Sequence, residues 1–347
     1  YLPLHTEQEL ISNLRRQMEA LNDISFTDTE WKRFYTTILA NQNNGIVEKT
    51  RLIQEDNVQT FLFDNGEQKN LRIFDRKNVH NNRLQVINQY TPEGGARDNR
   101  YDVTILVNGL PLVHVELKRR GVPIREVFNQ INRYQRESFW SGTGLFQYVQ
   151  IFVISNGTET KYYSNTTRFA HVRQNGGKQK PGQGRHTSNS FEFTSWWADE
   201  QNVPITDLTD FTKTFFAKHT LLNIIAKYCV FTSEQLLMVM RPYQICATEK
   251  IINRVIIAHN YHWEGSLQAG GYIWHTTGSG KTLTSFKTAR LATQLDFIDK
   301  VVFVVDRKDL DYQTMKEYDR FEKGAANSNT SSNILRRQLA SSDPQKK

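Results

Sequence analysis

Residues 101–121 read YDVTILVNGLPLVHVELKRRG, and this stretch decides the fold of the N-terminal half of the chain. Residues 103–107 are an apolar run rich in β-branched side chains, and residues 112–117 form a second run. The Asn108-Gly109 pair between them is the strongest short signal for a tight β-hairpin turn. The stretch therefore predicts two antiparallel strands joined by this turn.

Polar residues stand in the second strand, where a buried strand should be apolar: His114, Glu116 and then Lys118. Asp102 lies at the outer end of the first strand. Two carboxylates can hold a hard cation such as Mg²⁺ through oxygen, and that metal polarises a phosphate and lowers the pKa of an attacking water. Lys118 can position the water or offset charge on the phosphorus. The pattern favours a magnesium-dependent phosphodiesterase; a solvated strand end is the alternative.

The register of the hairpin decides whether such a site can form. A strict two-residue loop puts Asp102 opposite Val115 and turns Glu116 to the other face of the sheet. A three-residue connection or one β-bulge shifts the pairing by one residue, so that Asp102 lies opposite Glu116 and Lys118 follows on the same face. The nuclease interpretation therefore requires the longer connection or the bulge.

The composition of the 347 residues indicates roughly two domains with real cores, because 38% are hydrophobic and 20 are Phe. A net charge of +8 favours an anionic partner, most commonly nucleic acid, although a mildly basic soluble protein is the alternative.

The chain has only two cysteines, Cys229 and Cys246, which excludes a disulfide-rich secreted scaffold and favours a reducing cytosol. No apolar run reaches the roughly 18 residues of a membrane span, so no membrane partner is expected. No signal peptide is visible, and a start at Tyr1 indicates a trimmed chain.

The remaining pattern of the N-terminal half predicts a mixed sheet with helices. Thr6 and Glu9 predict a capped helix start, where Glu7 or Glu9 complements the helix dipole or reaches a metal. Gln130 and Tyr134 share one side of a predicted helix, which ordinary packing also explains. Helices are expected at 28–39, 124–139 and 211–228. Strands at 58–65, 71–75 and 84–89 should form one mixed sheet with the hairpin, and a further strand is expected at 148–154. A flexible basic loop is expected at 168–190, and a domain boundary near 230, bridged by the helix at 211–228.

A second chemical site lies at residues 275–282, HTTGSGKT, between an expected strand at 271–274 and an expected helix to about 291. Gly278 and Gly280 let backbone N–H groups approach phosphates, and the following helix adds its positive end. Lys281 reaches the β- and γ-phosphates, and Thr282 holds Mg²⁺. Thr277 and Ser279 complete the loop. The general pattern begins with Gly, and His275 stands there instead.

Residues 300–306, KVVFVVD, predict a fully buried strand of a parallel sheet. A helix from Cys246 to about His259 precedes this part, and residues 323–347 have no core pattern. The second half is therefore expected to be an α/β domain with a nucleotide at the carboxyl ends of its strands.

The combination resembles the motor (R) subunit of type I restriction enzymes, most closely the IC class. NRYDVTILVNGLPLVHVELKRRG, NQINRY, FVISNGT, RPYQ, GYIWHTTGSGKT and VVDRKDLDYQT all look like segments of that family. The resemblance implies an α/β fold: a restriction-endonuclease-like, PD-(D/E)xK, RecB-like mixed-sheet domain at 1–230 and a first RecA-like, superfamily 2 helicase-like parallel-sheet domain at 231–347, incomplete at its end. By the same resemblance, Asp102, Glu116 and Lys118 match the D…ExK nuclease site, Gln130 and Tyr134 the QxxxY element, and Gln244 the glutamine that reads adenine.

The resemblance also implies cofactors and partners: ATP and Mg²⁺, double-stranded DNA, and methyltransferase (M) and specificity (S) subunits in the bacterial cytoplasm. DNA cleavage is expected away from a recognition sequence that another subunit reads, and the acidic ATP-hydrolysis motif is expected beyond residue 347. The chain departs from the family by a shorter segment before Leu21 and a longer loop at 168–190. One alternative is a repair helicase-nuclease without a methyltransferase partner, and the other is a non-catalytic DNA-binding scaffold. Co-purification with a methyltransferase would distinguish a restriction subunit from the repair enzyme. Metal-dependent nicking of a plasmid would exclude the scaffold.

Overall fold

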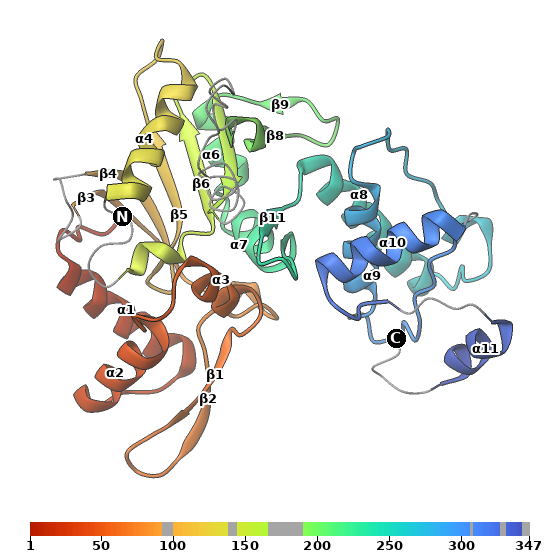
Figure 1. Cartoon of the computed structure of the whole chain (residues 1–347), viewed down its shortest axis with the longest axis horizontal. Helices are drawn as coiled ribbons and strands as arrows, with labels where there is room; N and C mark the ends of the chain where they lie inside the picture. Colours follow the sequence, from red (N-terminus) through yellow and green to blue (C-terminus); the bar gives the residue numbers. More distant parts are fainter. Residues whose placement is uncertain (92–99, 138–143, 166–189, 306–307, 327–330, 342–347) are drawn as a thin grey trace, which may run out of the picture. The chain divides into compact units, whose positions relative to one another are not determined.

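The computed structural model describes residues 1–91, 100–137, 144–165, 190–305, 308–326 and 331–341 (Figure 1). The chain divides into two compact units. The first comprises residues 1–199, 203–231 and 235–239, and the second comprises 200–202, 232–234 and 240–347. Within the described residues, no helix has both the length and the hydrophobicity needed to cross a bilayer.

A five-stranded mixed sheet with the order β3-β4-β5-β6-β7 forms the centre of the first unit. Only β5 and β6 are parallel neighbours; the other pairs are antiparallel. A parallel pair requires a crossover connection, and α4 (Ile124–Glu137) lies within it. The strands are β3 (Leu84–Tyr90), β4 (Tyr101–Val107), β5 (Leu110–Leu117), β6 (Ile151–Ser155) and β7 (Thr160–Ser164). The strands predicted at 84–89 and around the hairpin are confirmed, and the strand predicted at 148–154 begins three residues later, at Ile151.

The β4–β5 hairpin combines the two registers that the sequence allowed. Next to the turn, Val107 pairs with Leu110; beyond a bulge, Val103 pairs with Val115. The bulge lies beside Pro111, which has no backbone N–H to give to the ladder. The bulge that the nuclease interpretation required is therefore confirmed.

The turn itself is held by Asn108. Asn108 and Gly109 have φ values of 51° and 83°, as a two-residue type I′ turn requires. The Asn108 side chain accepts the Arg83 N–H at 2.9 Å and donates to Asn82 Oδ1 at 2.8 Å and to the Ile73 carbonyl at 3.2 Å. Because side-chain as well as backbone bonds anchor the turn, the start of β5 is fixed.

Helices surround the sheets of the first unit. Thr6 and Glu9 form the predicted capping box at the start of α1, with the Glu9 N–H donating to Thr6 Oγ1 and the Thr6 N–H to Glu9 Oε2. The helix predicted at 28–39 is confirmed as α2, which continues in a π-helical turn. Apart from α4, these elements are α1 (Glu7–Asn22), α2 (Asp28–Phe34), η1 (Tyr35–Leu39), α3 (Ile46–Gln54), η2 (Val79–Asn81), η3 (Leu145–Tyr148), η4 (Ser190–Phe193), α6 (Leu208–Phe215) and α7 (Lys218–Lys227).

The prediction that the strands near 58–75 join the central sheet is wrong. β1 (Val58–Leu62) and β2 (Gln68–Arg72) pair only with each other. Each strand buries a single residue, Phe61 or Leu71, so neither has the two apolar faces of a central strand. The Phe61 ring packs edge-on against Phe26 and Phe34 instead, which makes this hairpin a cover for the first helices.

The single helix predicted at 211–228 is also wrong, because the chain forms α6 and α7 with a break at Phe216 and Ala217. No Gly or Pro marks this break in the sequence. At the break, the Phe215 and Phe216 rings pack edge to face with centroids 5.6 Å apart, and Phe215 is fully buried. Two further small antiparallel pairs complete this unit: β8 (Trp197–Ala198) with β9 (Pro204–Ile205), and β10 (Cys229–Phe231) with β11 (Leu237–Val239).

The second unit is helical in its described residues. Its elements are α8 (Pro242–Asn260), η5 (Leu267–Ala269), α9 (Lys281–Ala292), α10 (Lys308–Phe321) and α11 (Ser332–Ala340). The helices predicted after the glycine-rich loop and at 246–259 are confirmed. Residues 168–189 of the predicted basic loop lie outside the described residues.

The strands predicted at 271–274 and 300–306 are wrong in every residue that the structure describes there, so the expected parallel sheet is not present in the described part of the second unit. A strand forms where a neighbour about 4.8 Å away completes its hydrogen bonds. Among the residues that the structure describes, neither segment pairs with a neighbour. The side chains of Tyr272, Trp274 and Val304 are 89%, 88% and 83% exposed.

We expect Gly109→Ala to destabilise the first unit by about 3 kcal/mol. A Cβ at this position would lie 2.7 Å from the Leu14 Cα of α1, and its φ of 83° is left-handed. The left-handed backbone costs an L-residue about 1–2 kcal/mol, and overpacking adds about 1–3 kcal/mol. Urea unfolding of the variant measures the loss.

Gly66→Ala is the matched control, because Gly66 has a φ of 85° but nothing within 4 Å of the added Cβ. This variant should lose only the backbone contribution, about 1 kcal/mol. Equal losses for the two variants would show that the approach of α1 to the turn does not constrain the hairpin.

Candidate functional site

The two predicted carboxylates come together at the end of the β4–β5 hairpin. Their neighbours Val103 and Val115 form the last pair of the β4–β5 ladder, and continuing this register brings Asp102 opposite Glu116. Asp102 Oδ2 accepts the Leu117 N–H at 2.8 Å, which fixes the orientation of that carboxyl group. Glu116 is fully buried.

Lys118 continues the same arrangement. Its backbone N–H donates to the Ser155 carbonyl at 2.9 Å, so the pairing of β5 with β6 extends through this residue. Alternation along an extended chain puts its side chain on the face of Glu116, two residues earlier. The side chain is half-buried. Lys118 therefore continues the line of Glu116, at the end of the hairpin that also carries Asp102.

Buried His114 connects Glu116 to the neighbouring strand. His114 Nε2 lies 3.3 Å from Glu116 Oε2, and His114 Nδ1 lies 3.3 Å from the Thr104 hydroxyl. Burial lowers the pKa of His114 to about 3, against a smaller opposing effect of Asp102, so the imidazole is neutral near pH 7. A neutral imidazole has one N–H. With that hydrogen on Nε2, the ring donates to Glu116 while Nδ1 accepts from Thr104.

The donor set fits a hard cation. Mg²⁺ usually keeps several waters and binds to protein through one or two carboxylates, which Asp102 and Glu116 provide. Within the described ranges, no group of three or more His, Cys, Asp and Glu side chains is arranged to hold a metal. The two carboxylates thus supply two of the oxygen ligands of such an ion, and waters would have to supply the others.

Helix α4 covers the face that carries the carboxylates (Figure 1). Its Phe128 ring lies 5.3 Å from Tyr163, and Tyr163 pairs with Phe152 across β6 and β7 on that face. Gln130 is half-buried on this helix. Tyr134 also belongs to α4, but its side chain lies outside the described residues. The helix therefore brings the Gln130 position to the carboxylate face.

In the second unit, the glycine-rich loop folds as a compact turn before α9. Gly278 and Gly280 have φ values of 77° and 79°, which only glycine adopts readily. A Cβ on Gly280 would lie 2.4 Å from Gln244 Nε2. Lys281 and Thr282 are the first two residues of α9, and Lys281 Nζ donates to the Thr276 carbonyl at 3.3 Å. The loop keeps its turn although the expected strand before it is absent.

Side chains of α8 and of the loop itself hold this turn. Gln244 Nε2 donates to the Ser279 carbonyl at 3.1 Å, while its Oε1 accepts the Arg241 N–H at 2.9 Å. The Tyr243 hydroxyl donates to the same Ser279 carbonyl at 2.8 Å, and His275 Nδ1 lies 3.0 Å from Ser279 Oγ. The structure places Gln244 against the loop; its role in reading adenine stays a prediction.

The loop also fits a bound phosphate group. Thr277, Gly278 and Lys281 are exposed to solvent. His275 Nε2 is enclosed and has no hydrogen-bond partner among the described residues. Buried polar atoms in native proteins are nearly always satisfied, often by water or ligand. An exposed loop beside an unsatisfied nitrogen is consistent with a nucleotide site.

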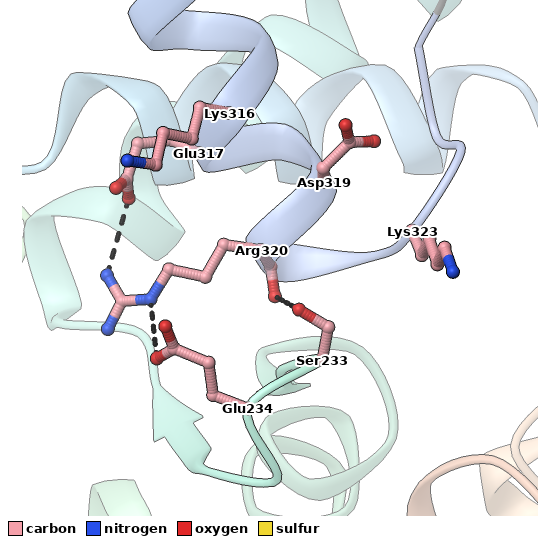
Figure 2. A pocket seen from close by; sticks show the side chains of 7 residues that line it. All are labelled: Ser233, Glu234, Lys316, Glu317, Asp319, Arg320 and Lys323. Atoms are coloured by element: carbon pink, nitrogen blue, oxygen red, sulfur yellow. Dashed lines mark hydrogen bonds and ion pairs between the residues drawn. The ribbon is translucent and has the colours of Figure 1, made fainter.

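Figure 2 shows a separate hollow in the second unit, at the end of α10. Arg320 pairs with Glu234 at 3.0 Å and with Glu317 at 3.4 Å, and its carbonyl accepts the Ser233 hydroxyl at 3.0 Å. The side chains that line the hollow are Ser233, Glu234, Lys316, Glu317, Asp319, Arg320 and Lys323. None of the predicted site residues lines it, and Arg320 is already paired, so we assign no site there.

Two families match the chain over the two parts just described. The type I restriction enzyme R protein N-terminus family matches residues 3–171, and the SWI2/SNF2 ATPase family matches residues 243–346. The type I restriction enzyme EcoprrI endonuclease subunit of Escherichia coli is 50% identical over 256 residues, covering 74% of this chain and 76% of that protein. This chain belongs to the endonuclease subunits of type I restriction enzymes.

Relatives in other bacteria extend the similarity. The SsaAORF53P endonuclease subunit of Staphylococcus saprophyticus is 38% identical over 97% of this chain, which spans only 33% of that relative. A putative MpnIIP endonuclease subunit, C-terminal part, of Mycoplasma pneumoniae is 51% identical over 145 residues, 41% of this chain and 70% of that protein. The architecture is thus a restriction-endonuclease part with a mixed sheet and an ATPase-like part.

Two residues of this endonuclease subunit were not singled out from the sequence. Thr104 looks like an ordinary β-branched strand residue, and only the register shows that it faces His114. Tyr243 lies in the RPYQ segment, but its contact with Ser279 spans 36 positions. A polar residue in an apolar strand is the one signal that could have identified Thr104.

We expect His114→Leu to destabilise the first unit by about 2 kcal/mol, because a buried carboxylate loses a hydrogen-bond donor. His114→Gln should cost clearly less, since its amide can still donate to Glu116. Urea unfolding at pH 7 compares the two variants. The same loss for both would show that the bond to Glu116 contributes nothing to stability.

We expect Tyr243→Phe to weaken nucleotide binding about fivefold, because one hydrogen bond to the Ser279 carbonyl, about 1 kcal/mol, no longer holds the loop. Calorimetric titration with a non-hydrolysable ATP analogue measures the change. Tyr261→Phe is the control, because Tyr261 is 67% exposed and stacks on Trp263. Unchanged affinity in Tyr243→Phe would contradict a role in positioning the loop.

Proposed function

We propose that this chain is the ATP-dependent DNA translocase and Mg²⁺-dependent endonuclease subunit of a type I restriction complex. It cleaves double-stranded DNA away from the recognition sequence and acts with methyltransferase (M) and specificity (S) subunits in the bacterial cytoplasm. The observation that carries the proposal is the shifted register that pairs Val103 with Val115, because its continuation brings Asp102 opposite Glu116 in a member of this family.

In cleavage, Asp102 and Glu116 would hold Mg²⁺, while the Leu117 N–H and His114 keep the two carboxylates oriented. When bound, the metal supplies Lewis-acid activation of the phosphate and of an attacking water. Lys118 adds positive charge where negative charge develops on the phosphate. Gln130 and Tyr134 on α4 approach the DNA from the helix that covers this face.

In translocation, the glycine-rich loop binds the phosphates of ATP. Gly278 and Gly280 allow the backbone N–H groups of the loop to approach them, and Lys281 contacts the β- and γ-phosphates. Thr282 holds the Mg²⁺ that accompanies ATP. Gln244, which anchors the loop from α8, also reads the adenine. The SWI2/SNF2 match over residues 243–346 supports this assignment.

We expect Asp102→Ala and Lys118→Ala to lower DNA cleavage by at least about 100-fold while DNA-stimulated ATPase stays near wild type. The metal and its charge neutralisation contribute several kcal/mol, and each 1.36 kcal/mol is a factor of ten in rate. Lys281→Ala should lose ATPase, translocation and cleavage together, because cutting follows stalled translocation. Plasmid cutting, ATP hydrolysis and triplex displacement are measured with the reconstituted complex.

Lys213→Ala is the control, because Lys213 is an exposed lysine of α6 that pairs with Asp210 and belongs to neither predicted site. This variant should keep all three activities. Normal cutting by Lys281→Ala, loss of ATPase in Lys118→Ala, or full cutting without the methyltransferase and specificity subunits would contradict the proposal.

A further inference from the structure

Two cations of the first unit face the same aromatic ring. Lys161 Nζ lies 4.7 Å from the centre of the Phe191 ring, and Arg125 Cζ lies 5.2 Å from it. Lys161 Nζ is also 4.5 Å from the Trp196 ring. Neither cation forms an ion pair with a carboxylate among the described residues. Phe191, Trp196, Lys161 and Arg125 therefore make a cation–aromatic cluster.

Three separate elements bring this cluster together. Lys161 lies on β7, Arg125 on the first turn of α4, and Phe191 in η4. The segment before Trp196 is fixed to the edge of the sheet, because Ser195 exchanges two backbone hydrogen bonds with Tyr162, at 2.8 and 3.0 Å. The cluster is thus built by the fold at the edge of the central sheet.

The arrangement of charge favours an anion. Each cation gains about 0.5–2 kcal/mol from an aromatic face, but the two like charges repel each other. Burial lowers the pKa of Lys161, since the charged ammonium has lost part of its water, and the Glu159 carboxylate has a smaller effect in the opposite direction. An anion held between the two side chains would relieve both effects.

The cluster lies in line with the carboxylates. Glu116 pairs with Ile154 on β6, and Ile154 pairs with Lys161 on β7, so Lys161 shares the face of Glu116. Two strand spacings separate them, about 10 Å. Successive phosphates of a DNA strand advance about 3.4 Å along the helix axis, so this separation corresponds to about three nucleotides.

We propose that Lys161 and Arg125, supported by Phe191 and Trp196, bind the phosphodiester backbone of DNA about three nucleotides from the bond that is cut at Asp102 and Glu116. This assignment rests on the proposed nuclease function and adds a contact site to it. Positive side chains neutralise the phosphates of double-stranded DNA, and this contact does not depend on base sequence. Phe193, at the end of the same segment, is 51% exposed and extends the aromatic surface.

The test is the salt dependence of DNA binding by the full-length subunit. Binding of a double-stranded 30-mer of arbitrary sequence is followed by fluorescence anisotropy, with divalent cations chelated so that the DNA stays intact. For K161A/R125A, the slope of log K against log salt should fall by about 1.8, because each lost phosphate contact removes about 0.9. K161R/R125K should keep the wild-type slope, because both charges remain.

R33A/K69A is the matched control. Arg33 and Lys69 also face aromatic rings, Phe61 at 5.0 Å and Phe63 at 5.7 Å, but each pairs with a carboxylate in the β1–β2 hairpin region. Removing these two charges should leave the slope unchanged. If K161A/R125A does not fold, as circular dichroism would show, K161Q/R125Q replaces it and must show the same fall.

An unchanged slope in K161A/R125A, an equal fall in R33A/K69A, or no DNA binding by the wild-type subunit would each overturn the assignment. Plasmid cutting by the wild-type complex separates this result from the proposed function. Wild-type cutting with an unchanged slope rejects the contact site alone. A fall in slope together with no cutting by the wild type rejects the nuclease function and keeps the anion site.

Discussion

The β-bulge beside Pro111 is the constraint on which the nuclease face depends. The two-residue turn at Asn108-Gly109 by itself sets a register in which Glu116 would face away from Asp102. The bulge shifts the pairing by one residue and reverses the face of every residue that follows. Both the tight turn and the bulge are therefore necessary. The turn fixes where β5 starts, and the bulge fixes the face of the sheet on which its polar residues lie.

The polar residues on this face remain buried because they satisfy one another. Glu116 and His114 are both fully buried, and burying a carboxylate without a partner is expensive. Thr104, His114 and Glu116 form a chain of contacts across two strands, so the position of the carboxylate is coupled to the packing of the sheet. A carboxylate held in this way is oriented before any ligand arrives.

Local features of the structure could be predicted from the sequence. The capping box of α1, the hairpin turn and the glycine-rich turn each depend on residues within about five positions. The sequence shows that a nuclease site would need a bulge, but it does not show that the bulge forms. Its formation depends on Pro111 and on contacts of Asn108 with distant residues. Thr104 and Tyr243 escaped notice for the same reason, since their partners come from other elements.

Membership of a sheet could not be predicted in the same way. The strands within residues 58–72 alternate as strands of the central sheet would, yet the buried Phe61 packs on aromatic side chains at α2 and before it. Residues 300–305 have the apolar composition of a central strand, yet composition says nothing about whether a neighbour is present to pair with them. Chemical motifs are local, whereas strand order and helix breaks such as the one at Phe216 are decided by packing over the whole unit.

The pairings of β5 with its two neighbouring strands differ in how much of the chain must be ordered before they can form. Its antiparallel side closes over a two-residue turn, and isolated hairpins form in about 1–10 μs. Its parallel side requires the whole crossover through α4, so the chain must pay a larger loop-closure entropy before β6 can pair. During folding, Asp102 and Glu116 can therefore meet on an open hairpin before β6, β7 and the cations at the sheet edge arrive beside them.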